Sequence, residues 1–217
     1  MKKRGLFWAV CLCLCLCLCL CLLLAAFLYL RKNQGQEQGQ EQAAAEAPGP
    51  VSPVTLAIGT DIHYLAPELT DQGAYFQNMT ENADGKMTGY SQEILEAFIQ
   101  QILAEKPDAL LLSGDLTFNG ERQSHQEFSQ KLREVENAGI PVLVIPGNHD
   151  LLNPMAAAFE GNGYRYVENI TPEEFEEIYY PFGYENALSK DEASLSYVVS
   201  LNDTLRILLL EIGRAHV

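Results

Sequence analysis

Three short apolar runs constrain the fold of this chain more than any other feature of its sequence. Each is rich in leucine or β-branched residues and too short for a stable helix, so each is predicted to be a buried strand. The three runs are Leu56–Thr60, Ala109–Leu112 and Ile140–Ile145. Helical apolar periodicity occupies the intervals over Ser91–Lys106 and Glu121–Ala138. This alternation predicts an α/β fold with parallel strands joined by right-handed crossovers.

Polar side chains follow each predicted strand directly. They are Asp61 and His63 after the first strand, Asp115 after the second, and Asn148, His149 and Asp150 after the third. Ligand sites in open α/β sheets gather beyond the carboxyl ends of the strands, so these side chains should meet at one edge. Residues two apart on a regular strand share a face, which lets Asp61 and His63 reach one ion. The sequence therefore predicts a metal site with oxygen and nitrogen donors.

Each of these residues also has an ordinary structural explanation. Asp61 and Asp115 belong to a residue type common in caps and turns, and Asn148 forms a frequent turn pair with the preceding glycine. His63 taken alone would be a partly buried histidine. The coincidence of three strand ends favours the metal site. His125 has no such support, and we expect it to be solvated or to pack its helix.

The same residues carry a resemblance to a known family. Asp61-Ile62-His63, then GDLTFNGE over Gly114–Glu121, then Gly147-Asn148-His149-Asp150 resembles the first three signature blocks of the calcineurin-like metallophosphoesterases. The resemblance spans Val54–Asp150. It implies that family's fold, a β-sandwich flanked by helices, of which the strand–helix alternation would form one half.

The resemblance also implies a role for each residue. Asp61 and His63 would hold a first ion, Asp115 would bridge two ions, and Asn148 would bind the second. His149 would contact the phosphoryl group and assist the leaving oxygen without binding metal, and Asp150 would orient it. A ligand set of Asp, His and Asn without thiolate suits two divalent ions of Mn, Fe, Zn or Ni. The chemical softness of these ligand atoms does not identify which of the four metals is bound. The implied reaction is attack of a metal-bridging hydroxide on a small phosphate mono- or diester.

The N-terminal region has the composition of a membrane anchor. Residues 1–4 are basic, and residues 5–30 form an uncharged apolar run in which Trp8 and Tyr29 would lie about 31 Å apart on a helix, close to the thickness of a bilayer core. Three basic residues precede the run and two follow it, which predicts a cytoplasmic N-terminus and an extracytoplasmic domain. The alternative is a secreted protein with a cleaved signal peptide, whose apolar region is normally about 7–15 residues. Residues 31–53 are predicted to be a disordered tether.

Composition limits the partners and the redox chemistry. The net charge of the 217 residues is −15, which argues against a nucleic-acid partner, because such a partner requires a basic face. All six cysteines lie in the N-terminal apolar run. The downstream sequence therefore has neither disulfides nor thiolate metal ligands.

The predicted domain, residues 54–211, contains one long connection and further elements toward its end. Tyr64–Gly89 is irregular and leaves from the predicted site, so a lid over the substrate and a decorative surface loop are equally supported. Thr171–Glu174 is a capping box that opens a helix reaching Tyr180. Leu195–Leu201 and Leu205–Leu210 predict a β-hairpin.

The family pattern is incomplete toward the C-terminal end. The family also uses an isolated later histidine and a Gly-His-x-His pair, and the sequence has neither. We therefore expect the domain to be truncated, and this chain alone to be unstable or inactive. Residues 212–217, IGRAHV, are also what a common sequencing adapter encodes, and we interpret them as a non-native tail.

Two functions from different classes are compatible with these observations. One is a membrane-anchored, extracytoplasmic, metal-dependent phosphoesterase. The alternative is a non-catalytic module of the same fold that binds a surface partner through Tyr64–Gly89. The enzyme is favoured because every one of the first three signature blocks retains its polar residues: Asp61, His63, Asp115, Asn148 and His149.

Overall fold

The computed structural model describes residues 53–82 and 86–213. The predicted anchor over residues 5–30 and nearly all of the predicted tether lie outside the described residues, as does the end of the predicted tail. Within the described ranges, no helix combines the length and the apolar character needed to cross a bilayer.

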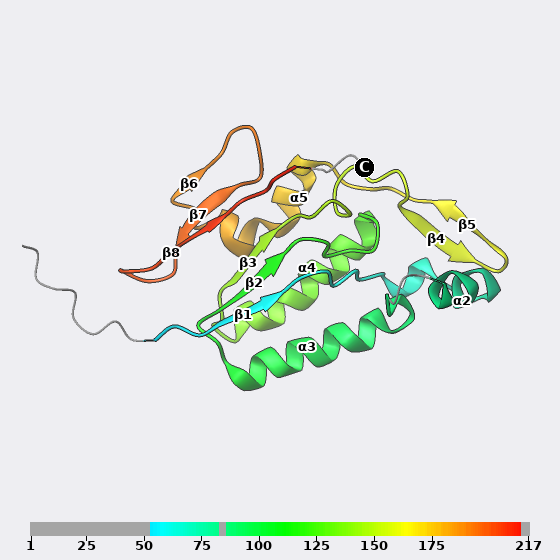
Figure 1. The fold of residues 1–217 in the computed structure, drawn as a ribbon, viewed down its shortest axis with the longest axis horizontal. Coiled ribbons are helices and arrows are strands. Elements are labelled where there is room, and N and C mark those ends of the chain that lie inside the picture. The colour runs from blue at the N-terminus through cyan, green and yellow to red at the C-terminus, as the bar shows by residue number, and fades with distance from the viewer. Residues whose placement is uncertain (1–52, 83–85, 214–217) are drawn as a thin grey trace, which may run out of the picture. The chain divides into compact units, whose positions relative to one another are not determined.

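A three-stranded parallel sheet forms the centre of the fold, as the sequence predicted. Its strands are β1 (Leu56–Gly59), β2 (Ala109–Ser113) and β3 (Val142–Ile145), in the order β1-β2-β3. Figure 1 shows β2 lying between its two neighbours. All four residues of β3 are buried, which explains why its sequence is an unbroken apolar run.

Two long helices connect these strands. They are α3 (Ser91–Glu105) and α4 (Arg122–Asn137), which contact one another and run alongside the parallel sheet (Figure 1). Each buries one apolar stripe: Leu95, Ile99 and Ile102 from α3, and Phe128, Leu132 and Val135 from α4. Both helices match the predicted ranges to within one residue at each end.

A second sheet follows later in the chain and confirms the predicted hairpin. It is antiparallel, and its strands are β6 (Ser189–Lys190), β7 (Tyr197–Ser200) and β8 (Arg206–Leu209). The buried Tyr197 hydroxyl donates to the carbonyl of Val144 over 2.7 Å, which ties β7 to β3. The fold is therefore mixed α/β, and it combines the parallel sheet with antiparallel strands.

The predicted helix that begins at Thr171 is also present. It is α5 (Pro172–Tyr179), opened by a capping box in which the Thr171 side chain and the Glu174 side chain each bind the other's backbone N–H. A π-helical turn, η3 (Tyr180–Tyr184), follows it.

The prediction that Tyr64–Gly89 is irregular was wrong. The segment contains η1 (Pro67–Leu69), α2 (Ala74–Glu81) and η2 (Thr88–Tyr90). It packs on a hairpin that the sequence analysis also missed, formed by β4 (Ala157–Glu160) and β5 (Gly163–Tyr166). The Phe76 and Phe159 rings lie 5.4 Å apart, and Asp71 N–H donates to the Phe159 carbonyl. This part of the connection is thus packed structure and not a free loop.

Candidate metal centre

Backbone hydrogen bonds between β1 and β2 continue beyond the ends of these strands. The residues that follow the strands include several in the left-handed region of backbone conformation. Asp61 N–H donates to the Gly114 carbonyl over 3.2 Å, and His63 N–H donates to the Asp115 carbonyl over 3.0 Å. Asp61, His63 and Asp115 have φ values of 54°, 48° and 49°. Such values cost energy for residues other than glycine and cluster at functional sites. Asp61 and His63 therefore come together because of this unusual backbone and not, as predicted, because they share a face of a regular strand.

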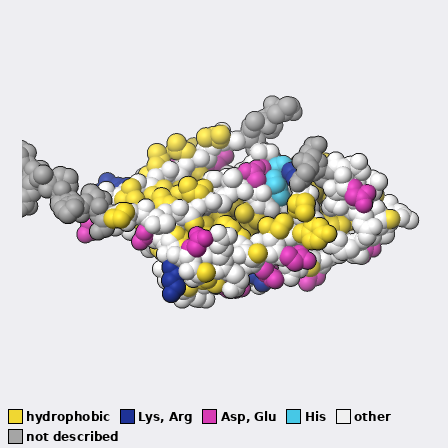
Figure 2. Space-filling model, turned by 60° about the horizontal axis from the view of Figure 1, so that its bottom comes forward, with side chains coloured by type: hydrophobic (Ala, Val, Ile, Leu, Met, Phe, Trp, Pro, Cys, Tyr) yellow, Lys and Arg dark blue, Asp and Glu magenta, His cyan; other side chains and the backbone are white. Residues whose placement is uncertain are grey.

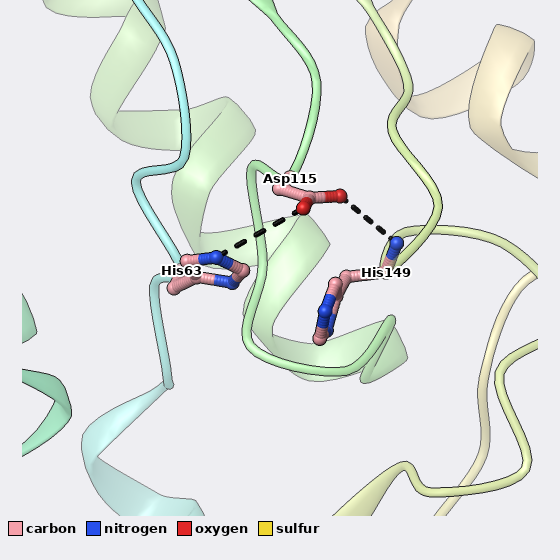
Figure 3. Close-up of side chains that lie close together, drawn as sticks. All are labelled: His63, Asp115 and His149. Atoms are coloured by element: carbon pink, nitrogen blue, oxygen red, sulfur yellow. Dashed lines mark hydrogen bonds and ion pairs between the residues drawn. The ribbon is translucent and has the colours of Figure 1, made fainter. Parts of the chain in front are cut away.

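Three side chains from three different strand ends converge at this edge of the sheet (Figure 3). The ligand atoms of His63, Asp115 and His149 all lie within 4.8 Å of one another. His63 Nε2 is 3.9 Å from Asp61 Oδ1 and 3.9 Å from Asp115 Oδ2. These distances are too long for hydrogen bonds, so the groups approach a common point without bonding to each other. Ligands that share an ion are arranged in this way.

The protonation state of His63 suits metal binding. Burial lowers the pKa of His63, the charge of Lys86 lowers it further, and the carboxylates of Asp115 and Asp61 offset only part of this effect. A lowered pKa favours the neutral ring, which is the form that donates a lone pair to a metal. The other ring nitrogen, Nδ1, is buried and has no hydrogen-bond partner within the described residues, which is rare for a buried polar atom. The donor set of imidazole nitrogen and carboxylate oxygen fits a divalent transition ion.

Two glycines allow the loops after β2 and β3 to touch. Gly114 has a φ of +85°, and a Cβ at this position would lie 2.9 Å from the Gly147 Cα. A Cβ on Gly147 would overlap the Asp115 carboxylate and its backbone nitrogen. This contact positions Asp115 Oδ1 to accept the His149 N–H over 2.9 Å. Glycine is required at both positions because the backbones of the two loops approach too closely for a side chain. This constrains the residue type more strongly than a sharp turn would.

The ring of His149 is held by the loop after β2. Its Nδ1 lies 2.8 Å from the Phe118 carbonyl and 3.1 Å from Asn119 Oδ1. A backbone carbonyl only accepts hydrogen bonds, so Nδ1 carries a proton. In the neutral ring this leaves the lone pair on Nε2. Sequence reasoning had included Asn119 in a signature block without giving it this role.

The structure corrects the predicted role of Asp150. Its carboxylate does not orient the His149 ring. It is fully buried and accepts hydrogen bonds from Leu116 N–H, Thr117 N–H, the Thr117 hydroxyl and Gly147 N–H over 2.8–3.1 Å. Asp150 therefore joins the loop that carries Asp115 to the loop that carries His149.

His125 is buried and belongs to the same network, so of the two predicted alternatives, solvated or packing its helix, the first is wrong. Its Nε2 lies 2.9 Å from the Asp150 carbonyl and 3.1 Å from the Thr117 hydroxyl, while its Nδ1 lies 2.9 Å from the Tyr179 hydroxyl. Because the Asp150 carbonyl only accepts, Nε2 carries the proton, and burial lowers the pKa of His125. The network extends the support of the site to α4 and α5.

Two of the predicted metal ligands face solvent. The Asp61 side chain is 63% exposed, and its Oδ2 accepts a hydrogen bond from the Thr60 hydroxyl over 2.6 Å. Asn148 is exposed, and within the described residues its amide forms no hydrogen bond. Both side chains are accessible to a ligand, and their roles stay predictions.

Glu121 offers a test of the electrostatics beneath the site. It is the N-cap residue of α4, without a side-chain capping hydrogen bond, and it is fully buried; its Oε2 accepts the Asn119 N–H over 3.1 Å. Its Oε1 has no partner within the described residues. Burial raises the pKa of Glu121 to about 7. Between its ordinary pKa and about 7, the unfolded chain releases this proton and the native protein keeps it, so stability falls as pH rises through that window.

Replacing Glu121 with glutamine should remove that loss. Relative to the variant, the native protein should lose up to about 1.4 kcal/mol of unfolding free energy per pH unit across the window. Urea denaturation from pH 5 to pH 8 measures the difference, with Glu93→Gln on the exposed face of α3 as a control for loss of one charge. Parallel pH profiles for native protein and Glu121→Gln would show that this carboxyl does not hold its proton.

The fold and the site together define a mixed α/β protein with a candidate metal centre at the carboxyl edge of its parallel sheet. Over residues 54–214 the sequence matches the calcineurin-like phosphoesterase family. The chain belongs to this family, as its signature blocks indicated.

Relatives with assigned names resemble shorter parts of the chain. A probable cyclic nucleotide phosphodiesterase of Ruthia magnifica is 43% identical over 68 residues, and another of Vesicomyosocius okutanii is 38% identical over 68 residues. A probable glycerophosphodiester phosphodiesterase of Arcobacter nitrofigilis is 34% identical over 58 residues. These matches cover 31%, 31% and 27% of this chain. The chain spans only 28%, 28% and 20% of the length of these relatives.

Proposed function

We propose that this protein is a metal-dependent phosphodiesterase, anchored in a membrane and facing away from the cytoplasm. The observation that carries the proposal is the convergence of His63, Asp115 and His149 from three strand ends in a member of the calcineurin-like phosphoesterase family. The names of the relatives support a diester, because all three denote phosphodiesterases. The substrate is proposed to be a small organic phosphodiester.

The side chains divide the work of holding two divalent ions. Asp61 and His63 would hold one ion, Asn148 would hold the other, and Asp115 would help to hold both. Bound ions supply a nucleophile from water near neutral pH and neutralise the charge on the phosphoryl oxygens. Asp115 Oδ1 also accepts the His149 N–H, so the carboxylate that would hold the ions also positions the histidine.

His149 would act on the phosphoryl group. With Nδ1–H held by Phe118 and Asn119, the ring presents its Nε2 side to the substrate. A proton taken up on Nε2 can hydrogen-bond a phosphoryl oxygen or pass to the leaving alkoxide. The fixed ring avoids the entropy loss of orienting a free side chain at the moment of reaction.

The proposed location is supported by sequence alone. Residues 5–30 are apolar and uncharged, and three basic residues precede them. Release of the full-length protein from membranes by alkaline carbonate would contradict the anchor.

Metal removal tests the proposed activity. Purified protein in a form that also carries the later histidines of the family pattern, loaded with Mn²⁺, should hydrolyse bis(p-nitrophenyl) phosphate faster than p-nitrophenyl phosphate. Chelation followed by dialysis should abolish turnover, and Mn²⁺, Fe²⁺, Zn²⁺ or Ni²⁺ should restore it, because the substrate charge is neutralised by the ions. Release of p-nitrophenolate and metal content by mass spectrometry are measured together. Turnover that survives complete metal removal would refute the mechanism, and no turnover with any of the four ions would refute the phosphodiesterase.

A further inference from the structure

A cavity of about 460 Å³ adjoins the candidate metal centre. Asp61 and His63 form part of one wall, so the cavity reaches the site directly. The opposite wall is formed by Lys86, Thr88 and the first turns of α3, up to Ile94. This volume is large enough for one organic group of a small ligand.

Lys86 gives the cavity a positive charge in an otherwise acidic protein. The net charge of the chain is −15, yet within the described residues Lys86 forms no ion pair with any carboxylate. Lys86 lines the same cavity as Asp61 and His63. An unpaired ammonium beside a site for anions is available to a negatively charged group of a ligand.

The rest of the lining is apolar with a few hydroxyls. Met87 and Ile94 are 58% and 46% exposed, although both are hydrophobic. The Thr88 hydroxyl is buried and has no hydrogen-bond partner within the described residues. On the face seen in Figure 2, histidine lies between acidic and basic side chains, with hydrophobic side chains gathered beside them. Apolar surface next to a few polar groups is typical of a site for an organic ligand.

We infer that this cavity binds the arm of the phosphodiester that does not leave, and that Lys86 selects arms carrying a further anionic group. This inference rests on the proposed phosphodiesterase function. With the scissile phosphate at the metal centre, an arm that extends toward α3 lies in a cavity lined by apolar side chains and by Lys86. The preferred substrate class is therefore an organic phosphodiester whose retained arm bears a phosphate or a carboxylate.

Matched substrates test the role of the charge. The p-nitrophenyl 5′-esters of thymidine 5′-phosphate and of thymidine 3′,5′-bisphosphate share one leaving group and differ only in the 3′-phosphate. The bisphosphate ester should have a KM lower by about tenfold, the scale of one hydrogen bond to a charged group. A second pair, p-nitrophenyl propyl phosphate and p-nitrophenyl 2-carboxyethyl phosphate, shows whether a carboxylate serves as well as a phosphate.

Three variants assign the preference to Lys86. Lys86→Gln should abolish the KM difference within each pair. Lys86→Arg should retain the difference, since it keeps the charge. Lys131→Gln is the matched control, because Lys131 pairs with Glu96 on the helices and does not line the cavity.

Equilibrium binding separates this inference from the activity. Metal-free protein is titrated by calorimetry with thymidine 5′-phosphate and with thymidine 3′,5′-bisphosphate. The bisphosphate should bind more tightly to native protein, and Lys86→Gln should remove the difference. Equal affinities, or a difference that persists in Lys86→Gln, would overturn the inference. Charge-dependent binding without turnover of any substrate would instead refute the phosphodiesterase and leave the anion site standing.

Discussion

Replacing Asp115 with asparagine is expected to lower kcat/KM for bis(p-nitrophenyl) phosphate by more than about 100-fold, because even residues that only orient a metal ligand contribute about 10- to 100-fold. The side chain presents one oxygen toward His63 and uses the other to accept the His149 N–H. An amide removes the negative charge and one ligand oxygen. Its remaining oxygen can still accept the His149 N–H, so the fold should be retained.

The control for this variant lies at the other end of the same strand. Asp108 is an exposed carboxylate that accepts the Thr55 N–H over 2.7 Å just before β2. Asp108→Asn should leave both turnover and metal content unchanged. Thermal unfolding and bound metal are measured for all three proteins. Normal turnover and normal metal content in Asp115→Asn would remove this carboxylate from the chemistry.

The arrangement of the site could be predicted because it follows from topology. Three apolar runs separated by helical patterns leave little choice other than parallel strands, whose carboxyl ends share one edge. Asp61, His63, Asp115, Asn148 and His149 were therefore predicted to meet. The structure brings Asp61, His63, Asp115 and His149 together, and the place of Asn148 in the site stays a prediction. Short-range patterns and a general rule of chain handedness were sufficient.

The local geometry could not be predicted in the same way. A strand pattern implies extended backbone, whereas Asp61, His63 and Asp115 adopt positive φ values that the surrounding packing imposes. The short helix α2 begins at Ala74, and its N-cap residue, Gly73, offers no side-chain cap, so the local signal for its start is weak. In both cases the structure is decided by contacts with residues far along the chain.

The buried polar network was missed for a related reason. His125 lies 25 residues from Asp150 and 54 residues from Tyr179, and each residue taken alone resembles an ordinary helix or turn residue. Asp150 follows His149 directly, which suggested that it orients that ring. In the structure its carboxylate reaches the other loop instead. Adjacency in sequence is thus a poor guide to the partners of a buried carboxylate, which must satisfy both oxygens wherever donors converge.

Replacing Asp150 with asparagine is expected to lower the free energy of unfolding by about 2 to 5 kcal/mol, because each buried group left without a partner costs about 1–3 kcal/mol. One oxygen accepts from Leu116 N–H and Gly147 N–H, and the other from Thr117. A carboxylate only accepts, whereas an amide donates on one side. In either orientation, the NH₂ group of the amide faces backbone N–H groups that need an acceptor. At least one buried backbone N–H is then left without a partner.

Asp71→Asn provides the matched control, since Asp71 also accepts two backbone N–H groups, from Gly73 and Gly161, both over 2.7 Å. Asp71 is exposed, so water can replace a lost bond, and its variant should lose less than about 1 kcal/mol. Urea denaturation of the two variants compares them. Because Asp150 joins the loops of Asp115 and His149, Asp150→Asn should also bind Mn²⁺ more weakly under native conditions. Equal stability losses in the two variants would contradict the role of burial, and unchanged Mn²⁺ affinity would contradict the coupling of this carboxylate to the site.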